Sequence, residues 1–283
     1  MRRTWTELPA SVRTEIQNRC SAVVTTETPA AGTSSDFSAT LHLLDGKVFC
    51  KGVELDNPKS RMHRHEARVN AWLPSTAPRL LWTIETGGWL LLGFEHVDGR
   101  HADLSPGSPD LPLIANTVAT LDLTPCPVDV PSFAEQWTWL SAWRRLVHAG
   151  EFQDEHNFVE WELSAQQFVD GDTLLHTDLH TWNIMVGDRV RVLDWAWSRR
   201  GAAWVDAGFL VLRLIQAGHD PHAAETWAES IPAWREANDE ARTAFAIAVL
   251  GVWEFKQRDD PLPHREKLTA AARIWVKHRL GLT

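Results

Sequence analysis

Between two apolar runs of the chain lies the stretch His176-Thr177-Asp178-Leu179-His180-Thr181-Trp182-Asn183, and Asp194 follows eleven residues later at the end of a further apolar run. Phosphoryl transfer from ATP needs one carboxylate that accepts the proton of the attacking hydroxyl. It also needs a carboxylate and a neutral oxygen ligand that hold Mg²⁺ against the phosphates. Asp178, Asn183 and Asp194 supply these groups at the spacing of kinase catalytic and metal-binding loops. The stretch therefore predicts an ATP- and Mg²⁺-dependent kinase.

A lysine and a glutamate upstream of this stretch fit the same chemistry. Lys51 closes the apolar strand-like run that begins at Lys47, and Glu66 lies fifteen residues further on, in a predicted helix. In kinases such a lysine binds the α- and β-phosphates and pairs with a helix glutamate. Taken alone, Lys51 could equally be a solvated strand-end residue and Glu66 a surface glutamate. Their order ahead of the catalytic stretch favours the kinase interpretation.

The loop between the first two predicted strands is the expected phosphate-binding segment. It reads Ala30-Ala31-Gly32-Thr33-Ser34-Ser35-Asp36, with one glycine where a protein kinase has G-x-G-x-x-G. Small residues and the hydroxyls of Ser34 and Ser35 still allow backbone N–H groups to approach phosphate oxygens. A plain polar hairpin loop is the competing interpretation.

The pattern of apolar residues changes from strand-like to helical along the chain. Strands are expected over residues 22–27, 37–44, 47–53, 80–85 and 89–94, with one helix over 60–72. Residues 95–112 are rich in glycine and proline, which is typical of a linker or hinge. Helices are expected over 113–121, 132–147, 159–168 and from 204 onward, with short strands at 173–175, 184–186 and 190–193. The chain is therefore predicted to be α+β, with a β-rich first part and a mainly helical second part.

Composition narrows the class of partner. The formal net charge of −9 disfavours a nucleic-acid partner. The absence of an 18-residue apolar stretch disfavours a membrane-spanning helix. The three cysteines form no Cys-x-x-Cys pair, which favours a reducing cytoplasm over a disulfide framework. An acidic chain suits a cationic substrate, although many enzymes are simply acidic.

In these motifs the chain resembles the aminoglycoside phosphotransferase family, relatives of choline kinases and, more distantly, of protein kinases. That family carries an H-x-D-x-x-x-x-N loop, then an aspartate often followed by tryptophan, as in Leu193-Asp194-Trp195, and then a Gly-x-x-x-x-Asp element, as in Gly201 to Asp206. The resemblance implies a bilobal protein kinase-like fold. A small antiparallel β-sheet lobe would span 1–94, a hinge 95–99 and a larger helical lobe 100–283.

The resemblance also implies roles for individual residues. Asp178 would be the catalytic base, and Asn183 and Asp194 would ligate Mg²⁺. Lys51 would contact the ATP phosphates, and Glu66 would orient it. The chain departs from the family at its glycine-poor phosphate loop and at Trp182, where glycine is common.

A hinge and a structural carboxylate complete the implied site. The run from Leu90 to Gly99 resembles the family's last strand and hinge, where adenine would bond to the backbone at Glu95 and Val97, beside Phe94. Asp206 would be structural, at a helix start that braces the catalytic loop.

The two histidines of the central stretch allow more than one interpretation. His176 and His180 have the spacing of two zinc ligands on a helix, but the zincin pattern requires glutamate after the first histidine and Thr177 stands there. We expect His176 to brace the loop. His180 and Trp197 are candidates for the acceptor site, His180 with a structural role as the alternative.

The predicted reaction is transfer of the ATP γ-phosphate to a hydroxyl of a small molecule, most simply an aminoglycoside or another antibiotic-like acceptor. Kinases for choline-like or sugar metabolites, and a non-catalytic pseudokinase, are the alternatives. A protein kinase is disfavoured because twelve positions from Asp194 to Asp206 leave no room for a long activation segment. Carboxylates at Asp154, Glu155, Glu254, Asp259 and Asp260 could bind amines of an acceptor or could simply be solvated. The oligomeric state cannot be predicted.

Overall fold

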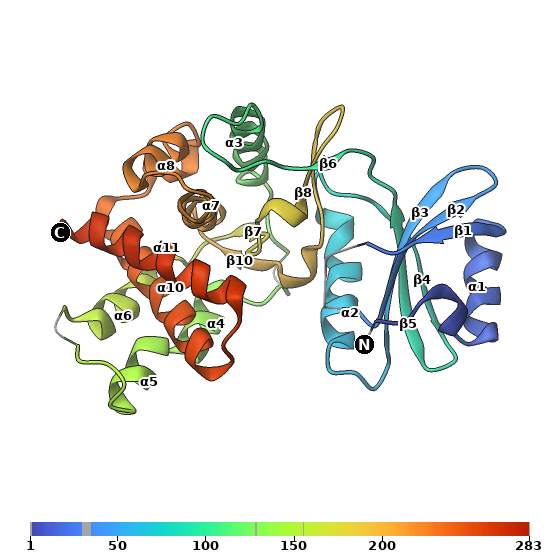
Figure 1. Ribbon diagram of the computed structural model, residues 1–283, viewed down its shortest axis with the longest axis horizontal. Helices are drawn as coiled ribbons and strands as arrows, with labels where there is room; N and C mark the ends of the chain where they lie inside the picture. Colours follow the sequence, from blue (N-terminus) through green and yellow to red (C-terminus); the bar gives the residue numbers. More distant parts are fainter. Residues whose placement is uncertain (1, 30–34, 128, 155, 283) are drawn as a thin grey trace. The chain divides into compact units, whose positions relative to one another are not determined.

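The computed structural model describes residues 2–29, 35–127, 129–154 and 156–282, without the side chains of 138–140 (Figure 1). It divides into two compact units, Met1–His101 with Trp182–Trp197, and Ala102–Thr181 with Ser198–Thr283. The lobe limits 1–94, 95–99 and 100–283 stay a prediction. Within the described ranges, no helix combines the length and the apolar character that crossing a membrane requires.

The first unit is built on a five-stranded antiparallel sheet in the order β1-β2-β3-β5-β4. The strands are β1 (Val23–Glu27), β2 (Phe37–Leu43), β3 (Lys47–Glu54), β4 (Leu80–Thr86) and β5 (Trp89–Glu95). Each predicted strand is found within about a residue of its expected limits. The predicted helix over 60–72 is α2 (Ser60–Val69), continued by a 3₁₀ turn, Asn70–Trp72.

Side-chain alternation gives this sheet two apolar faces. Cys50 of β3 and Leu91 of β5 point to a core shared with helix α1 (Ala10–Cys20). Val53 and Leu92 point to the other face, where α2 packs, and the two helices lie on opposite sides of the sheet (Figure 1). Because successive strand residues alternate between faces, Lys51 projects to the α2 face. The strand pattern thus decides which helix Lys51 can meet.

A second, smaller sheet of the first unit comes from a distant part of the chain. Strands β8 (Ile184–Val186) and β9 (Val190–Val192) form a hairpin, and β6 (Arg100–His101) pairs with β8. Gly99 passes so close to this hairpin that a Cβ would come 2.7 Å from the Val186 carbonyl oxygen. This contact fixes the hairpin to the chain that follows β5.

The second unit is mainly helical, with a two-stranded sheet of β7 (Thr173–Leu175) and β10 (Arg199–Gly201). Its helices are α3 (Asp110–Leu121), α4 (Phe133–Leu140), α5 (Ala142–His148), α6 (Phe158–Phe168), α7 (Val205–Gln216), α8 (Pro221–Ala228), α9 (Pro232–Glu236), α10 (Asp239–Asp259) and α11 (Pro263–Leu280). Helices α10 and α11 run side by side (Figure 1).

Aromatic rings fill the core of the second unit. The ring of Phe245 on α10 lies 5.1 Å from Trp204 and 5.5 Å from Trp137, measured between centroids. Gly208 on α7 allows this approach, since a Cβ there would meet the Phe245 ring at 2.7 Å. Trp137 and Trp143 are buried.

The predicted single helix over 132–147 is wrong, because the chain breaks at Ser141 into α4 and α5. Ser141 has φ +32°, in the left-handed region. The Glu162 carboxylate of α6 accepts hydrogen bonds from the backbone N–H groups of Trp143 and Arg144 and so stabilises the start of the new helix. Residues 132–147 alone do not indicate this contact, because Glu162 lies outside that segment.

A buried carboxylate joins α10 to α11. Glu254 is 1% exposed and accepts hydrogen bonds from Arg258 on its own helix and from Arg273 on α11. Burial alone would raise the pKa of Glu254, but the two guanidinium groups outweigh it and hold the pKa below its usual value. The pair of contacts fixes the part of α10 that carries Trp253 and Lys256.

We expect Glu254→Gln to lower the free energy of unfolding at pH 7 by about 1–2 kcal/mol, because charge-assisted hydrogen bonds are lost to partly solvated arginines. A carboxylate with a depressed folded-state pKa stabilises the protein above its unfolded pKa and ceases to do so as pH falls through the folded pKa. The difference between wild type and variant should therefore shrink below about pH 4. Urea unfolding at pH 7 and pH 3.5, with the exposed Glu266→Gln as control, measures it. An equal difference at both pH values would contradict the assignment.

Candidate active site

Lys51 is the centre of a buried ion cluster in the first unit. Its Nζ lies 2.6 Å from Glu66 Oε2 and 2.7 Å from Asp194 Oδ1. Glu66 Oε1 also accepts a hydrogen bond of 3.2 Å from the backbone N–H of Trp195. The side chains of Lys51 and Glu66 are 7% and 4% exposed, whereas that of Asp194 is 33% exposed. Asp194 is therefore the member of the cluster that can reach a ligand.

The cluster keeps Lys51 charged. Burial alone would lower the pKa of Lys51, but the carboxylates of Asp194 and Glu66 outweigh it and raise the pKa above its usual value. A buried charge is tolerated only when it is paired and hydrogen-bonded. Lys51 is thus a fixed ammonium group and not a titrating one near neutral pH.

Asn183 and Asp194 flank the open end of the β8–β9 hairpin. Ile184 pairs with Val192, and the backbone N–H of Leu193 donates to the Asn183 carbonyl oxygen at 2.8 Å. Asp194 follows directly with φ +61°, a left-handed conformation rarely adopted outside glycine. The hairpin therefore brings the two predicted metal ligands to one end of a short sheet.

This donor set fits Mg²⁺. A carboxylate and an amide supply the hard oxygen atoms that Mg²⁺ prefers, and Mg²⁺ is usually held by one or two protein groups together with substrate phosphates. Asp194 Oδ1 contacts Lys51, and the partial exposure of the side chain leaves room for a further ligand. Asn183 and Asp194 are the residues of the first unit that would hold the ion.

One of the two predicted phosphate-loop hydroxyls has a defined partner. Ser35 Oγ lies 3.0 Å from His63 Nε2, while His63 Nδ1 lies 3.1 Å from the Lys59 carbonyl oxygen. Since only a protonated Nδ1 can donate to that carbonyl, Nε2 accepts from the serine hydroxyl. Burial, followed by the charge of Lys51, lowers the pKa of His63 to about 4, so this ring is neutral. Ser34 lies outside the described residues.

The predicted hinge residues occupy different environments. Phe94 is buried in the α2-side core, with its ring centroid 5.7 Å from Lys51 Nζ. The Glu95 carboxylate pairs with Arg191 at 2.8 Å, which lowers the pKa of Glu95, and its backbone N–H donates to Arg79. An adenine base at Glu95 would thus have to use the carbonyl oxygen. Val97 is half-buried.

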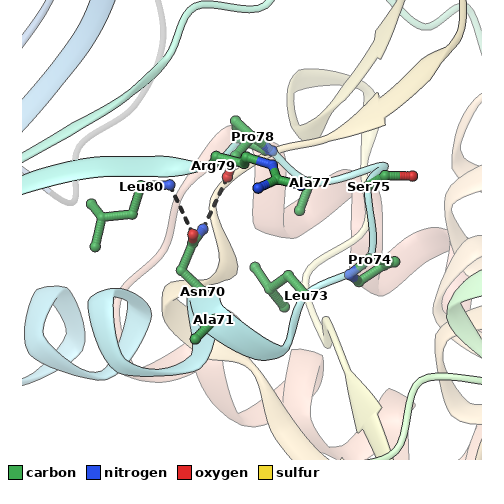
Figure 2. Close-up of a pocket in the computed structure, with 9 residues that line it drawn as sticks. All are labelled: Asn70, Ala71, Leu73, Pro74, Ser75, Ala77, Pro78, Arg79 and Leu80. Atoms are coloured by element: carbon green, nitrogen blue, oxygen red, sulfur yellow. Dashed lines mark hydrogen bonds between the residues drawn. The ribbon is translucent and has the colours of Figure 1, made fainter.

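A pocket of about 290 Å³ lies at the end of α2 in the first unit (Figure 2). It is lined by residues between Asn70 and Leu80, none of which is a predicted site residue. Figure 2 shows Asn70 closing this loop, where its side chain donates to the Pro78 carbonyl oxygen and accepts from the Leu80 N–H. Asn70 explains the shape of the loop, and no predicted chemistry falls in this pocket.

In the second unit, Asp206 at the start of α7 holds the loop before Asp178. Its two carboxylate oxygens accept the backbone N–H groups of His176 at 2.7 Å and Thr177 at 2.8 Å. The Asp178 N–H donates to His176 Nδ1 at 3.2 Å, so the imidazole is bound as an acceptor at that atom. Burial raises the pKa of Asp206, opposed by His176 and the two backbone bonds. These contacts suit the bracing roles predicted for His176 and Asp206.

The Asp178 carboxylate is partly exposed, and polar side chains of its own unit lie close to it. His180 Nε2 lies 3.6 Å from Oδ2, and Arg213 Nη2 of α7 lies 3.9 Å from Oδ1. Arg213 was not predicted as a site residue, because the sequence indicates only that it lies on a helix. His63 and Arg191 were not predicted either, because each makes its contact, with Ser35 or with Glu95, to a residue distant in the chain.

Trp197, the other acceptor-site candidate, belongs to the first unit and is 40% exposed. The exposed Trp182 packs edge-on against His101, with ring centroids 4.8 Å apart. The aromatic ring at the family's glycine position is therefore held at the surface of the first unit. The acceptor role of Trp197 stays a prediction.

The architecture has known counterparts at low sequence identity. A thermostable mutant of aminoglycoside phosphotransferase APH(4)-Ia, in ternary complex with ADP and hygromycin B, superposes with a TM-score of 0.61 at 12% identity, covering 94% of this chain and 99% of that chain. Choline kinase LicA from Streptococcus pneumoniae gives 0.61 at 12% identity, covering 94% and 98%. A putative fructosamine-3-kinase from Haemophilus somnus 129PT gives 0.60 at 14%, covering 93% and 95%. At these identities the likeness establishes the fold.

The family assignment comes from the sequence. Comparison with the curated proteins finds no match. The sequence profile of the phosphotransferase enzyme family (APH) matches residues 56–245, about two thirds of the chain. That range includes Glu66 and the whole stretch from His176 to Asp206. The chain belongs to the phosphotransferase enzyme family and is a small-molecule phosphotransferase with a kinase-like α+β fold.

Proposed function

We propose that this enzyme transfers the γ-phosphoryl group of ATP to a hydroxyl of a small molecule. The observation that carries the proposal is the cluster in which buried Lys51 lies between Glu66 and partly exposed Asp194. A fixed ammonium beside a carboxylate that can bind Mg²⁺ suits the charge of a nucleotide triphosphate. The aminoglycoside phosphotransferase named above is bound to ADP, and LicA is also known in complex with AMP, which supports a nucleotide donor.

In the proposed reaction the acceptor oxygen attacks the γ-phosphorus in line. The new oxygen–phosphorus bond forms as the bond to the β-phosphate oxygen breaks, and ADP leaves. Asp178 orients the hydroxyl and takes its proton, while Lys51 offsets charge on the phosphates. Asn183 and Asp194 would hold Mg²⁺, which when bound neutralises charge on the phosphate oxygens. The five positions from Asp178 to Asn183 keep the proposed base and the first proposed ligand close along the chain.

The remaining predicted residues serve nucleotide binding in this proposal. Adenine would bond to the Glu95 carbonyl and the Val97 N–H beside Phe94, and the hydroxyls of Ser34 and Ser35 would face the phosphates. Lobes 1–94 and 100–283 and a hinge at 95–99 belong to the same proposal. An aminoglycoside, choline and fructosamine are the substrates that the names of the compared enzymes indicate for those enzymes. An antibiotic-like acceptor for this chain is therefore one class among several.

We expect Asp178→Asn to reduce kcat by about 10²–10⁴-fold, because the amide cannot take the proton of the hydroxyl. ADP release over a panel of hydroxyl compounds measures turnover, and calorimetric titration measures nucleotide affinity, which should not change. Asp188→Asn, an exposed carboxylate in the β8–β9 turn, is the matched control. Turnover of Asp178→Asn within threefold of wild type would remove Asp178 as the base.

We expect Glu66→Gln to weaken ATP binding about tenfold. The amide keeps the shape of the side chain but removes the charge that holds Lys51, and hydrogen bonds to charged groups are worth about 1.5–3 kcal/mol. Calorimetric titration with ATP measures the change, with the partly exposed Glu15→Gln, whose carboxylate pairs with Arg19, as control. An unchanged ATP affinity in a folded Glu66→Gln protein would show that this pair does not order the phosphate site.

A further inference from the structure

Two cations and an indole ring lie next to one another close to Asp178 in the second unit. Trp253 and Lys256 are on α10, and Arg213 is on α7. Lys256 Nζ lies 5.1 Å from the Trp253 ring centroid, and Arg213 Cζ lies 6.0 Å from it. Arg213 Nη2 also lies 3.9 Å from the Asp178 carboxylate. The group will be called the basic cluster: Arg213, Trp253 and Lys256.

The basic cluster is poorly neutralised. Lys256 is exposed, and its Nζ forms no ion pair or hydrogen bond with any residue that the structure describes. Arg213 has a hydrogen bond of 3.2 Å to neutral Gln216, besides the long contact with Asp178. Arg213 thus lies beside Asp178, and the charge of Lys256 also interacts with that carboxylate.

Two arginines of this unit show the contrast, because each has a carboxylate partner. Arg242 pairs with Glu229 at 2.6 Å, and Arg265, the cation next to Lys256, pairs with Asp260 at 2.8 Å. Although much of the Lys256 side chain is exposed, the protein atoms around its ammonium group partly desolvate it and lower its pKa, and the charges of Arg265 and Arg213 lower it further. An anion beside Lys256 would relieve this crowding of like charges.

The carboxylates that could have bound an amine are largely committed to the fold. Glu254 is buried between Arg258 and Arg273, and Asp260 is paired with Arg265. Asp154 accepts the backbone N–H groups of Phe158 and Val159 at the start of α6. Glu155 lies outside the described residues. Three of the five candidate carboxylates, Asp154, Glu254 and Asp260, are thus held by partners within the second unit.

We propose that the acceptor is a hydroxy acid: a small molecule whose carboxylate is bound by Lys256 and Arg213 while its hydroxyl reaches Asp178. This inference rests on the proposed phosphotransfer and names the substrate class of that reaction. Lys256 has no carboxylate partner among the described residues, and the carboxylate of a monoanionic acceptor would balance its charge. Guanidinium and ammonium groups both donate charge-assisted hydrogen bonds to carboxylates. Trp253 offers an apolar face to the carbon chain between the two functional groups.

The experiment compares acceptors that differ by one carboxylate: L-homoserine against 3-amino-1-propanol, D-glucuronate against D-glucose, and D-glycerate against glycerol. ADP release with Mg²⁺ and ATP gives kcat/KM for each compound, and saturation-transfer NMR without nucleotide gives binding independently of turnover. The variants are Lys256→Gln and Lys256→Glu. Lys267→Gln, an exposed lysine on α11 without a resolved partner, is the matched control.

We expect wild type to prefer at least one acid over its partner by about tenfold or more, since a hydrogen bond between charged groups is worth that factor. Lys256→Gln should bring the ratio close to one, Lys267→Gln should leave it unchanged, and Lys256→Glu should favour 3-amino-1-propanol over L-homoserine. A wild-type preference for the uncharged or amine partners overturns the inference. An unchanged ratio in Lys256→Gln also overturns the inference. A Lys256 variant that raises only the KM for ATP overturns it as well, because Lys256 would then bind the nucleotide.

The two readouts separate this inference from the proposed function. Equal phosphorylation of both members of every pair leaves the phosphotransferase reaction standing and removes the acidic acceptor. Binding of an acid to wild type that is lost in Lys256→Gln, without phosphorylation of any compound, supports the acid-binding cluster and contradicts the proposed reaction. Acids that neither bind nor react contradict the inference directly.

Discussion

The ammonium group of Lys51 is the constraint on which the first unit depends. A buried cation is costly unless its partners are placed well, and here they come from a helix and from a segment 143 positions further along the chain. The alternation of side chains along β3 directs Lys51 toward α2, which carries Glu66. Asp194 can complete the cluster only if the β8–β9 hairpin folds with the β-rich unit. The grouping of Trp182–Trp197 with residues 1–101 is the structural consequence.

Two residues of the proposed site adopt backbone conformations that non-glycine residues avoid. Thr177 has φ +63° and Asp194 has φ +61°. Such conformations cost about 1–3 kcal/mol each and persist where the surroundings fix them. Asp206 fixes the first by binding the N–H groups of His176 and Thr177, and Lys51 with Glu66 fixes the second. At both of these positions a buried carboxylate, that of Asp206 or Glu66, takes part in the contacts that hold the unfavourable conformation.

Much of this arrangement could be predicted from sequence, because it follows from short-range patterns. Period-two apolar runs predicted the strands of the first unit. The order of the motifs predicted that Lys51 pairs with Glu66 and that Asp194 belongs to the same site. What failed depended on contacts between distant residues. The break at Ser141 is stabilised by Glu162, and nothing within the run 132–147 reports it. The contacts of Arg213 and Arg191 could not be predicted, because an arginine on a helix or strand usually faces solvent.

Overall composition and local geometry lead to different expectations about the acceptor. A net charge of −9 invites the expectation of a cationic substrate. Charge interactions in solution decay over about 8 Å at physiological salt, so a substrate hydroxyl at Asp178 responds to the few groups within that distance. Arg213 is one of those groups, and Lys256 shares the Trp253 ring with it, whereas Glu254 and Asp260 are paired with arginines. The proposed acidic acceptor follows from these local pairings and not from the net charge of the chain.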